Sequence, residues 1–133
     1  MSEEKKKISL PIANPEEATP APKTRAEGGD IQSEIAREVT DHKVVLYMKG
    51  HPAQPMCGFS ARAAAILGAY GHPFHAVNIL EDPEKRQGIK EFSNWPTIPQ
   101  VYVDGEFLGG SDILMEMHEN GELAPVIEEA FAK

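Results

Sequence analysis

The apolar run from Val44 to Met48 constrains the fold of this sequence more than any other feature. Its residues are all apolar or aromatic and begin with two valines, so the run lacks the alternation of a strand with one wet face. Continuous runs of this kind are typical of strands that are buried on both faces, as in parallel sheets. We therefore predict a buried, parallel strand over residues 44–48.

Other patterns along the chain predict an α-β-α-β-α-β-β-α-α order of elements. Apolar residues at spacings of three and four indicate helices, and short runs of β-branched and aromatic residues indicate strands. The predicted helices cover residues 30–41, 58–70, 82–92, 111–117 and 123–131, and the predicted strands cover residues 44–48, 75–80, 100–103 and 106–108. Gly71 is expected to end the second helix. Phe59 belongs to the apolar stripe of the second predicted helix, and Ile113, Leu114 and Met117 are expected to face inward on the fourth.

The connections between the predicted strands define the sheet. A strand–helix–strand crossover makes the first two strands parallel, whereas the two-residue Asp104-Gly105 turn makes the last two antiparallel with a type I′ geometry. Lys49–Pro55 is expected to be a loop, because one glycine and two prolines interrupt it. The predicted fold is α/β, with a mixed four-stranded sheet flanked by helices on both faces.

Charge and cysteine content exclude several classes of protein. The formal net charge of −8 argues against nucleic-acid binding through clustered Lys and Arg, and against a basic membrane-surface peptide. No apolar run approaches the ~18 residues of a membrane-spanning helix. The single cysteine excludes an intramolecular disulfide and any zinc site that needs several cysteines of one chain.

Residues 1–29 differ in composition from the rest of the chain. They contain no aromatic residue and four prolines, and their acidic and basic side chains cancel. Such a segment buries too little apolar surface to offset its ordering entropy, so we predict a disordered N-terminal tail over residues 1–29. The globular domain is then expected to cover residues 30–133.

Cys57 is the first candidate for chemistry, because it follows a proline-punctuated loop and precedes a predicted helix. At such a position the backbone N–H groups and the positive end of the helix dipole stabilise the thiolate and lower its pKa. Lys49, at the end of the preceding strand, adds a nearby cation. The alternative is that Cys57 is simply a small buried apolar residue.

Four separated motifs together resemble the monothiol glutaredoxins of the Cys-Gly-Phe-Ser class. They are Lys49, Cys57-Gly58-Phe59-Ser60, Trp95-Pro96-Thr97-Ile98-Pro99-Gln100 and Gly109-Gly110-Ser111-Asp112. The resemblance covers about residues 30–133 and implies a thioredoxin-like fold. Ser60 stands where a dithiol protein has its second cysteine, so only one-thiol exchange with glutathione remains open. Otherwise, Ser60 is an exposed serine of the first helical turn.

The resemblance also implies a binding site for glutathione. Its candidate residues are Lys49, Arg86, Thr97, Ile98, Pro99, Gly110, Ser111 and Asp112. Thr97-Ile98-Pro99 is similar to the cis-proline segment of this family, whose free backbone groups pair with an extended tripeptide. Backbone N–H groups at the helix start after Gly110 suit a carboxylate, and Asp112 suits an α-ammonium group. The alternatives are an ordinary loop, a simple helix cap and, for Arg86, a solvated helix face.

A count of thiolates links this site to an iron–sulfur cluster. A [2Fe–2S] cluster normally needs four thiolates, whereas one chain offers only Cys57. The resemblance implies cluster carriage and transfer by a homodimer, with Cys57 of each chain and two glutathione molecules (or a glutathione conjugate) as ligands. The apo form would be a monomer. Similar proteins also pair with a BolA-like partner and donate clusters to iron–sulfur acceptor proteins.

Two enzymatic alternatives remain beside cluster transfer. One is a glutathione-dependent monothiol thioltransferase acting on mixed disulfides. The loop from Lys49 to Cys57 is longer than in dithiol glutaredoxins, and similar proteins with this longer loop hold glutathione in a geometry poorly suited to disulfide reduction. The resemblance therefore implies at most a weak oxidoreductase. The other is a Cys–His hydrolase with His51 as base, which lacks an evident third orienting residue or oxyanion site. The resemblance suggests the mitochondrial matrix as compartment, with the cytoplasm as the alternative.

Overall fold

The computed structural model describes residues 30–132, so the prediction of a disordered tail over residues 1–29 lies outside the described residues. A four-stranded sheet forms the centre, in the order β5 (His75–Asn78), β2 (Val44–Met48), β6 (Gln100–Val103) and β7 (Glu106–Gly109). β2 runs parallel to β5 and antiparallel to β6, and β6 runs antiparallel to β7. The mixed sheet confirms the predicted fold class.

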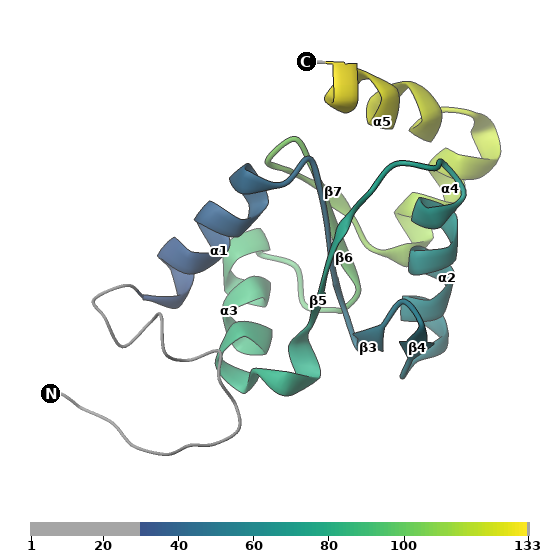
Figure 1. The fold of residues 1–133 in the computed structure, drawn as a ribbon. Helices are drawn as coiled ribbons and strands as arrows, with labels where there is room; N and C mark the ends of the chain where they lie inside the picture. The colour runs from purple at the N-terminus through teal and green to yellow at the C-terminus, as the bar shows by residue number, and fades with distance from the viewer. Residues whose placement is uncertain (1–29, 133) are drawn as a thin grey trace, which may run out of the picture. The chain divides into compact units, whose positions relative to one another are not determined.

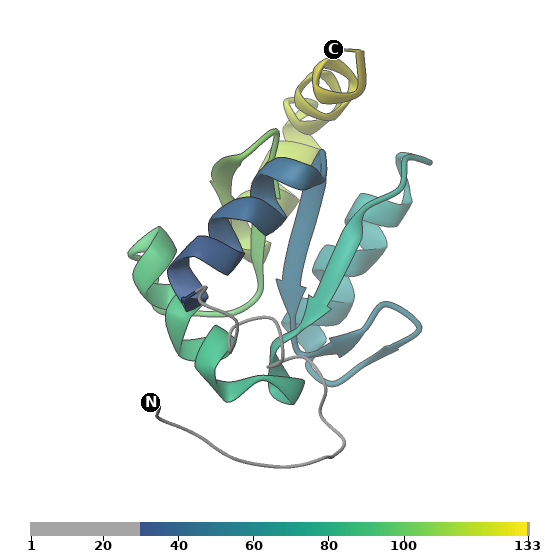
Figure 2. The same cartoon turned by 60° about the vertical axis from the view of Figure 1, so that its left-hand side comes forward.

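Helices cover both faces of this sheet. They are α1 (Ile31–Asp41), α2 (Gly58–Gly68), α3 (Pro83–Ser93), α4 (Ser111–Asn120) and α5 (Leu123–Ala132), with a short 3₁₀ helix η3 (Ile79–Glu81) before α3. Figures 1 and 2 show α1 and α3 on one side of the sheet, and α2 and α4 on the other. Among residues 30–132, no helix is long and apolar enough to cross a membrane.

β2 is buried along its whole length, as its apolar run predicts. Val45 and Tyr47 pack with the buried side chains of α1 and α3, such as Ile35 and Ile89. The other three residues of β2 belong to the second core, which contains side chains of α2, α4 and α5. A single strand therefore contributes to both cores, which explains why its sequence does not alternate.

The turn between β6 and β7 also follows the prediction. Asp104 and Gly105 have φ angles of 53° and 84°, and two successive positive φ angles define a type I′ turn. The turn is held against the start of β2, because the Asp104 N–H donates to the Lys43 carbonyl at 2.7 Å.

Several details of the predicted elements were wrong. β5 ends at Asn78 instead of residue 80, since the Asn78 side chain caps η3 by accepting from the Leu80 N–H. α2 ends at Gly68 and not next to Gly71, because its last turn tightens and the Tyr70 and Gly71 N–H groups bond three residues back. The segment predicted as a loop contains a small hairpin of β3 (Gly50–His51) and β4 (Gln54–Pro55).

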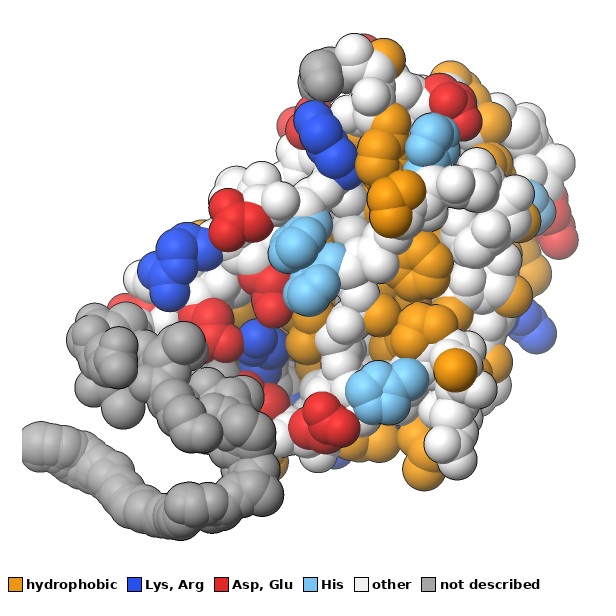
Figure 3. Space-filling view, in the orientation of Figure 1, with side chains coloured by type: hydrophobic (Ala, Val, Ile, Leu, Met, Phe, Trp, Pro, Cys, Tyr) orange, Lys and Arg blue, Asp and Glu red, His pale blue; other side chains and the backbone are white. Residues whose placement is uncertain are grey.

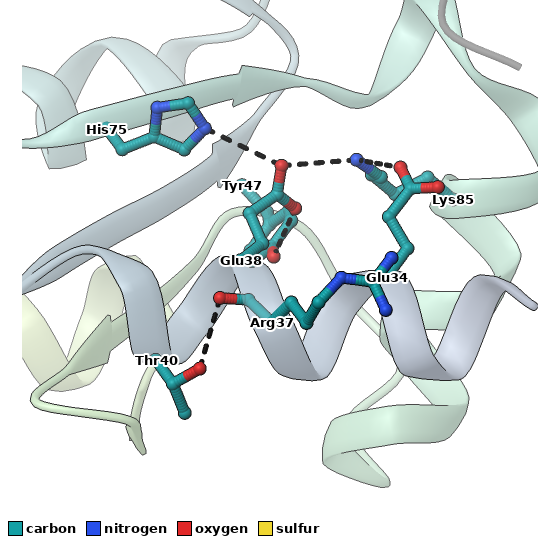
Figure 4. Close-up of polar contacts among 7 residues, drawn as sticks. All are labelled: Glu34, Arg37, Glu38, Thr40, Tyr47, His75 and Lys85. Carbon is teal, nitrogen blue, oxygen red and sulfur yellow. Dashed lines mark hydrogen bonds and ion pairs between the residues drawn. The ribbon is translucent and has the colours of Figure 1, made fainter. Parts of the chain in front are cut away.

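A largely buried charge cluster joins α1, α3 and the sheet (Figure 4), and the sequence analysis did not anticipate it. Lys85 Nζ lies 2.8 Å from Glu34 Oε2 and 3.2 Å from Glu38 Oε2, with the Lys85 side chain only 8% exposed. The Tyr47 hydroxyl donates to Glu38 Oε1 at 2.6 Å. Burial and the Glu38 carboxylate raise the pKa of Tyr47, so this donor stays protonated. His75 Nε2 lies 3.5 Å from Glu38.

Removal of the Lys85 charge is predicted to destabilise the protein strongly. Lys85→Met leaves two carboxylates in a largely buried site without their cation, which should lower the free energy of unfolding by about 3 kcal/mol. Arg86→Met is the matched control, because Arg86 is the next residue of α3 and is exposed, and it should change stability by less than about 0.5 kcal/mol. Urea unfolding measures both.

Adding Glu34→Gln and Glu38→Gln to Lys85→Met should recover part of the loss, since the unpaired charges are then gone. Equal unfolding midpoints for Lys85→Met and Arg86→Met would show that the cluster does not stabilise the fold.

Candidate functional site

A pocket of about 400 Å³ lies at one end of the sheet, where several predicted site residues meet. Its walls come from the end of β2, the first turn of α2, the exposed side of α3, the segment before β6 and the first turn of α4. The lining residues are Lys49, Phe59, Arg86, Lys90, Trp95, Pro96, Thr97, Ile98, Pro99, Gly110, Ser111, Asp112 and Ile113. All eight candidate glutathione-site residues therefore border one cavity.

Three cations border this pocket although the chain as a whole carries a net charge of −8. They are Lys49, Arg86 and Lys90. On the face of the molecule in Figure 3, by contrast, basic side chains are scattered among acidic and apolar ones. The pocket therefore favours an anionic ligand. Sequence analysis missed Lys90, although its position four residues after Arg86 on the same helix indicates a shared face.

Cys57 lies at the N-cap of α2, two residues before Phe59 in the pocket wall. Its backbone is extended, with φ −162° and ψ 140°, and its side chain is half-buried. The pKa of the Cys57 thiol is held below its ordinary value, chiefly by the backbone N–H of Ser60. Partial burial opposes this shift, while the Phe59 N–H, the Ser60 hydroxyl and the Lys49 charge add to it. The direction is the one expected from the sequence.

Ser60 is fully buried, so the alternative of an exposed first-turn serine is wrong. Its hydroxyl oxygen accepts a hydrogen bond from the Lys49 N–H at 3.0 Å. This bond ties the first turn of α2 to the end of β2. Ser60 therefore stabilises the thiolate at Cys57 and also positions Lys49 beside it.

The segment before β6 is fixed by hydrogen bonds to Gln100, the first residue of β6. The Gln100 side chain is fully buried. The Gln100 amide donates to the carbonyls of Trp95 at 3.0 Å and Thr97 at 3.2 Å. The Ile98–Pro99 peptide bond is cis, as the resemblance implies. A Cβ atom on Gly110 would lie 3.3 Å from the Pro99 carbonyl oxygen, so a small residue lets α4 approach this segment closely.

Phe59 and Ile113 lie outside the core, although Phe59 is part of an apolar stripe in the sequence and Ile113 is predicted to face inward. They are 57% and 39% exposed, and both border the pocket. Each lies in the first turn of its helix, where that turn forms part of the pocket wall. Met56, just before Cys57, is 62% exposed. The surroundings of the thiol are therefore partly apolar.

The geometry does not support a hydrolase with His51 as base. His51 Nε2 lies 3.4 Å from Glu81 Oε2, so its partner is η3 rather than the thiol. Within residues 30–132, no group of three His, Cys, Asp or Glu side chains could hold a metal ion.

Comparisons with known proteins agree with this architecture. The Glutaredoxin family profile matches residues 44–108. A ycf64-like monothiol glutaredoxin of Synechocystis sp. is 52% identical over 103 residues, which are 77% of this chain and 96% of the relative. Mitochondrial monothiol glutaredoxin-5 of Saccharomyces cerevisiae is 51% identical over 106 residues, which are 77% of this chain and 71% of the relative.

A solved structure supports the same fold. The solution structure of reduced poplar apo GrxS14 is 47% identical in sequence and matches with a TM-score of 0.70. The match covers 80% of this chain and 97% of the poplar chain. The thioredoxin-like fold implied by the sequence motifs is thereby confirmed.

The electrostatics of Cys57 predict how the midpoint pH of thiol alkylation ranks among the native protein, two variants and the unfolded protein. The rate of iodoacetamide reaction follows the thiolate, so its midpoint pH should be lower in the native protein than in urea. Ser60→Ala should move the midpoint upward, and Lys49→Gln should move it less, because the Lys49 charge is the weaker cause. The midpoint pH of both variants should stay below that of the unfolded protein, since the backbone N–H groups at Cys57 remain.

The single cysteine makes this measurement specific, because no other side-chain thiol reacts. Arg62→Gln is the control for a lost surface cation on α2, and its profile should match that of the unsubstituted protein. A native profile that coincides with the unfolded one would refute thiolate stabilisation at the N-cap.

Proposed function

Because the chain belongs to the monothiol glutaredoxin family, we propose that it binds glutathione beside Cys57 and carries a bridging [2Fe–2S] cluster for transfer to acceptor proteins. The observation that carries the proposal is the combination of one stabilised thiolate with an adjoining cation-lined pocket. A lone thiolate supplies one ligand, and the pocket can supply a second thiol from a bound small molecule.

The pocket is suited to glutathione by charge and by shape. Glutathione is an extended tripeptide with two carboxylates and one ammonium group. Arg86 and Lys90 on α3 can pair with one carboxylate, and the N–H groups at the start of α4 with the other. Asp112 is exposed at the same helix start and can pair with the ammonium group. Ile98, of the cis-proline segment, borders the same cavity.

The proposed cluster is cargo, and the number of thiolates determines how it is held. One chain contributes Cys57, and one bound glutathione contributes a second thiol, so two chains and two glutathione molecules complete four ligands. Because glutathione is held without covalent bonds, a cluster bound in this way can be released to an acceptor. A homodimer is therefore the proposed cluster-bound state, and a monomer the proposed apo state.

Two further parts of the proposal concern partners and location. A BolA-like protein is a proposed alternative partner to the second copy, and iron–sulfur acceptor proteins are the proposed recipients. The mitochondrial matrix is the proposed compartment, supported by the name of the yeast relative. The Synechocystis relative is bacterial, so the cytoplasm is the alternative.

Anaerobic reconstitution with iron, sulfide and glutathione tests cluster binding. We expect visible absorbance that elutes with a dimer in size-exclusion chromatography, and a colourless monomer after glutathione is removed. Cys57→Ser should lose the cluster and keep its circular dichroism spectrum, because serine is close in size to the half-buried cysteine and is itself a favourable N-cap residue. Retained absorbance in Cys57→Ser would overturn the ligand assignment.

A colourless monomer in the presence of glutathione would overturn the cluster proposal itself. In that case, a coupled assay with a glutathione mixed disulfide decides whether the same thiol acts as a thioltransferase. Turnover as fast as that of a dithiol glutaredoxin would favour the enzymatic alternative.

The cations on α3 are predicted to determine the affinity for glutathione. Loss of one charge-assisted bond, worth about 1.5–3 kcal/mol, weakens binding roughly 10- to 100-fold. We expect this loss for Arg86→Gln and for Lys90→Gln, measured by calorimetry in a Cys57→Ser background that prevents mixed disulfides. Arg62→Gln, an exposed cation on α2 outside the pocket, should bind normally. Equal affinities for all three variants would contradict the assigned pocket.

A further inference from the structure

Asn78 lies at the junction between two walls of the pocket, although it does not line the cavity itself. It is the last residue of β5 and pairs in register with Met48, the last residue of β2. Its side-chain oxygen Oδ1 accepts two hydrogen bonds, from the Gly50 N–H at 2.8 Å and from the Leu80 N–H at 3.0 Å. One oxygen atom therefore joins two segments that diverge from the ends of neighbouring strands.

The first of these segments leads to Lys49 and Cys57. Gly50 is buried, with a φ of 91°, and a Cβ atom there would lie 2.6 Å from the Gln54 carbonyl oxygen. The bond to Asn78 thus holds the β3–β4 hairpin, which is tightly packed at Gly50. Lys49 precedes Gly50, and its carbonyl accepts from the Met56 N–H at 2.8 Å. The hairpin therefore returns directly to the residue before the thiol.

The second segment leads to the cations of α3. Asn78 caps η3, and η3 is followed at once by Asp82, whose Oδ1 accepts from the Lys85 N–H at 3.1 Å to cap α3. The Arg86 N–H bonds to the Asp82 carbonyl at 2.9 Å. The start of α3, and with it Arg86, is therefore attached to Asn78 through one short helix.

We propose that Asn78 is a positioning residue that fixes the separation between the Lys49 side and the Arg86–Lys90 side of the pocket. The inference rests on the proposed function in its reference to glutathione. A ligand that contacts both sides binds more tightly when their separation is already fixed, because ordering the two sides during binding costs affinity. Asn78 fixes the separation because its side-chain oxygen accepts a hydrogen bond from each segment.

Asn78→Ala tests the proposal by removing both hydrogen bonds. Calorimetry in the Cys57→Ser background should show about tenfold weaker binding of glutathione. Amide hydrogen exchange supplies a readout that needs no ligand. The Met56 and Arg86 N–H groups do not bond to Asn78, yet both should exchange about tenfold faster relative to the Val45 N–H in the core.

Two variants separate positioning from a general loss of stability. Asn120→Ala removes an Asn side-chain bond of the same kind, from the Glu122 N–H to Asn120 Oδ1 at 3.1 Å, at the far end of α4. It should leave the glutathione affinity and the relative exchange rates unchanged. Asn78→Asp keeps an acceptor oxygen and should restore both readouts, measured at about 0.5 M salt to screen its added charge.

The two readouts also separate this inference from the proposed function. If the unsubstituted protein fails to bind glutathione, the proposed function fails, and hydrogen exchange alone decides the role of Asn78. Unchanged relative exchange at Met56 and Arg86 in Asn78→Ala would overturn the inference. So would an equal response of Asn78→Ala and Asn120→Ala, or a failure of Asn78→Asp to restore the exchange rates.

Discussion

The candidate site depends on the hydrogen bonds of two consecutive backbone N–H groups, those of Lys49 and Gly50, which follow the buried strand β2. The Lys49 N–H donates to the Ser60 side chain, and the Gly50 N–H donates to the Asn78 side chain. A buried N–H without an acceptor costs about 1–3 kcal/mol, so the chain is strongly constrained at this point. Because Ser60 belongs to the helix that begins after Cys57, and Asn78 precedes the helix with Arg86, these two bonds bring the chemistry together.

The sequence predicts the elements of this fold well where local signals and tertiary packing agree. The apolar run of β2 predicts burial on both faces, and the Asp104-Gly105 pair predicts a type I′ turn; both are confirmed. The contacts that the sequence does not reveal are those in which a side chain acts over a long separation. Nothing local in the sequence indicates that Asn78, besides capping η3, also accepts from the N–H of Gly50, 28 positions earlier. The same is true of Lys85, whose carboxylate partners lie on a different helix.

Helical periodicity fails at Phe59 and Ile113 for a related reason. Periodicity identifies a stripe on a helix, and it assumes that a neighbouring layer covers the stripe along its whole length. The first turns of α2 and α4 border the pocket, and their apolar residues Phe59 and Ile113 remain exposed. Apolar residues in the first turn of a helix that borders a pocket are therefore better interpreted as part of a binding surface.

The exposed apolar side chains beside the single thiol bear on the cluster-bound assembly that we propose. Cys57 is one thiolate, and residues 30–132 contain no cluster of His, Cys, Asp or Glu that could complete a metal centre around it. Met56 and Phe59 flank the thiol and are more than half exposed, which is unfavourable in water but favourable in a contact. In the proposed cluster-bound state, a second chain that supplies further thiolates would also cover this apolar surface. The ligand count of the proposed cluster and the hydrophobic effect would then favour the same assembly.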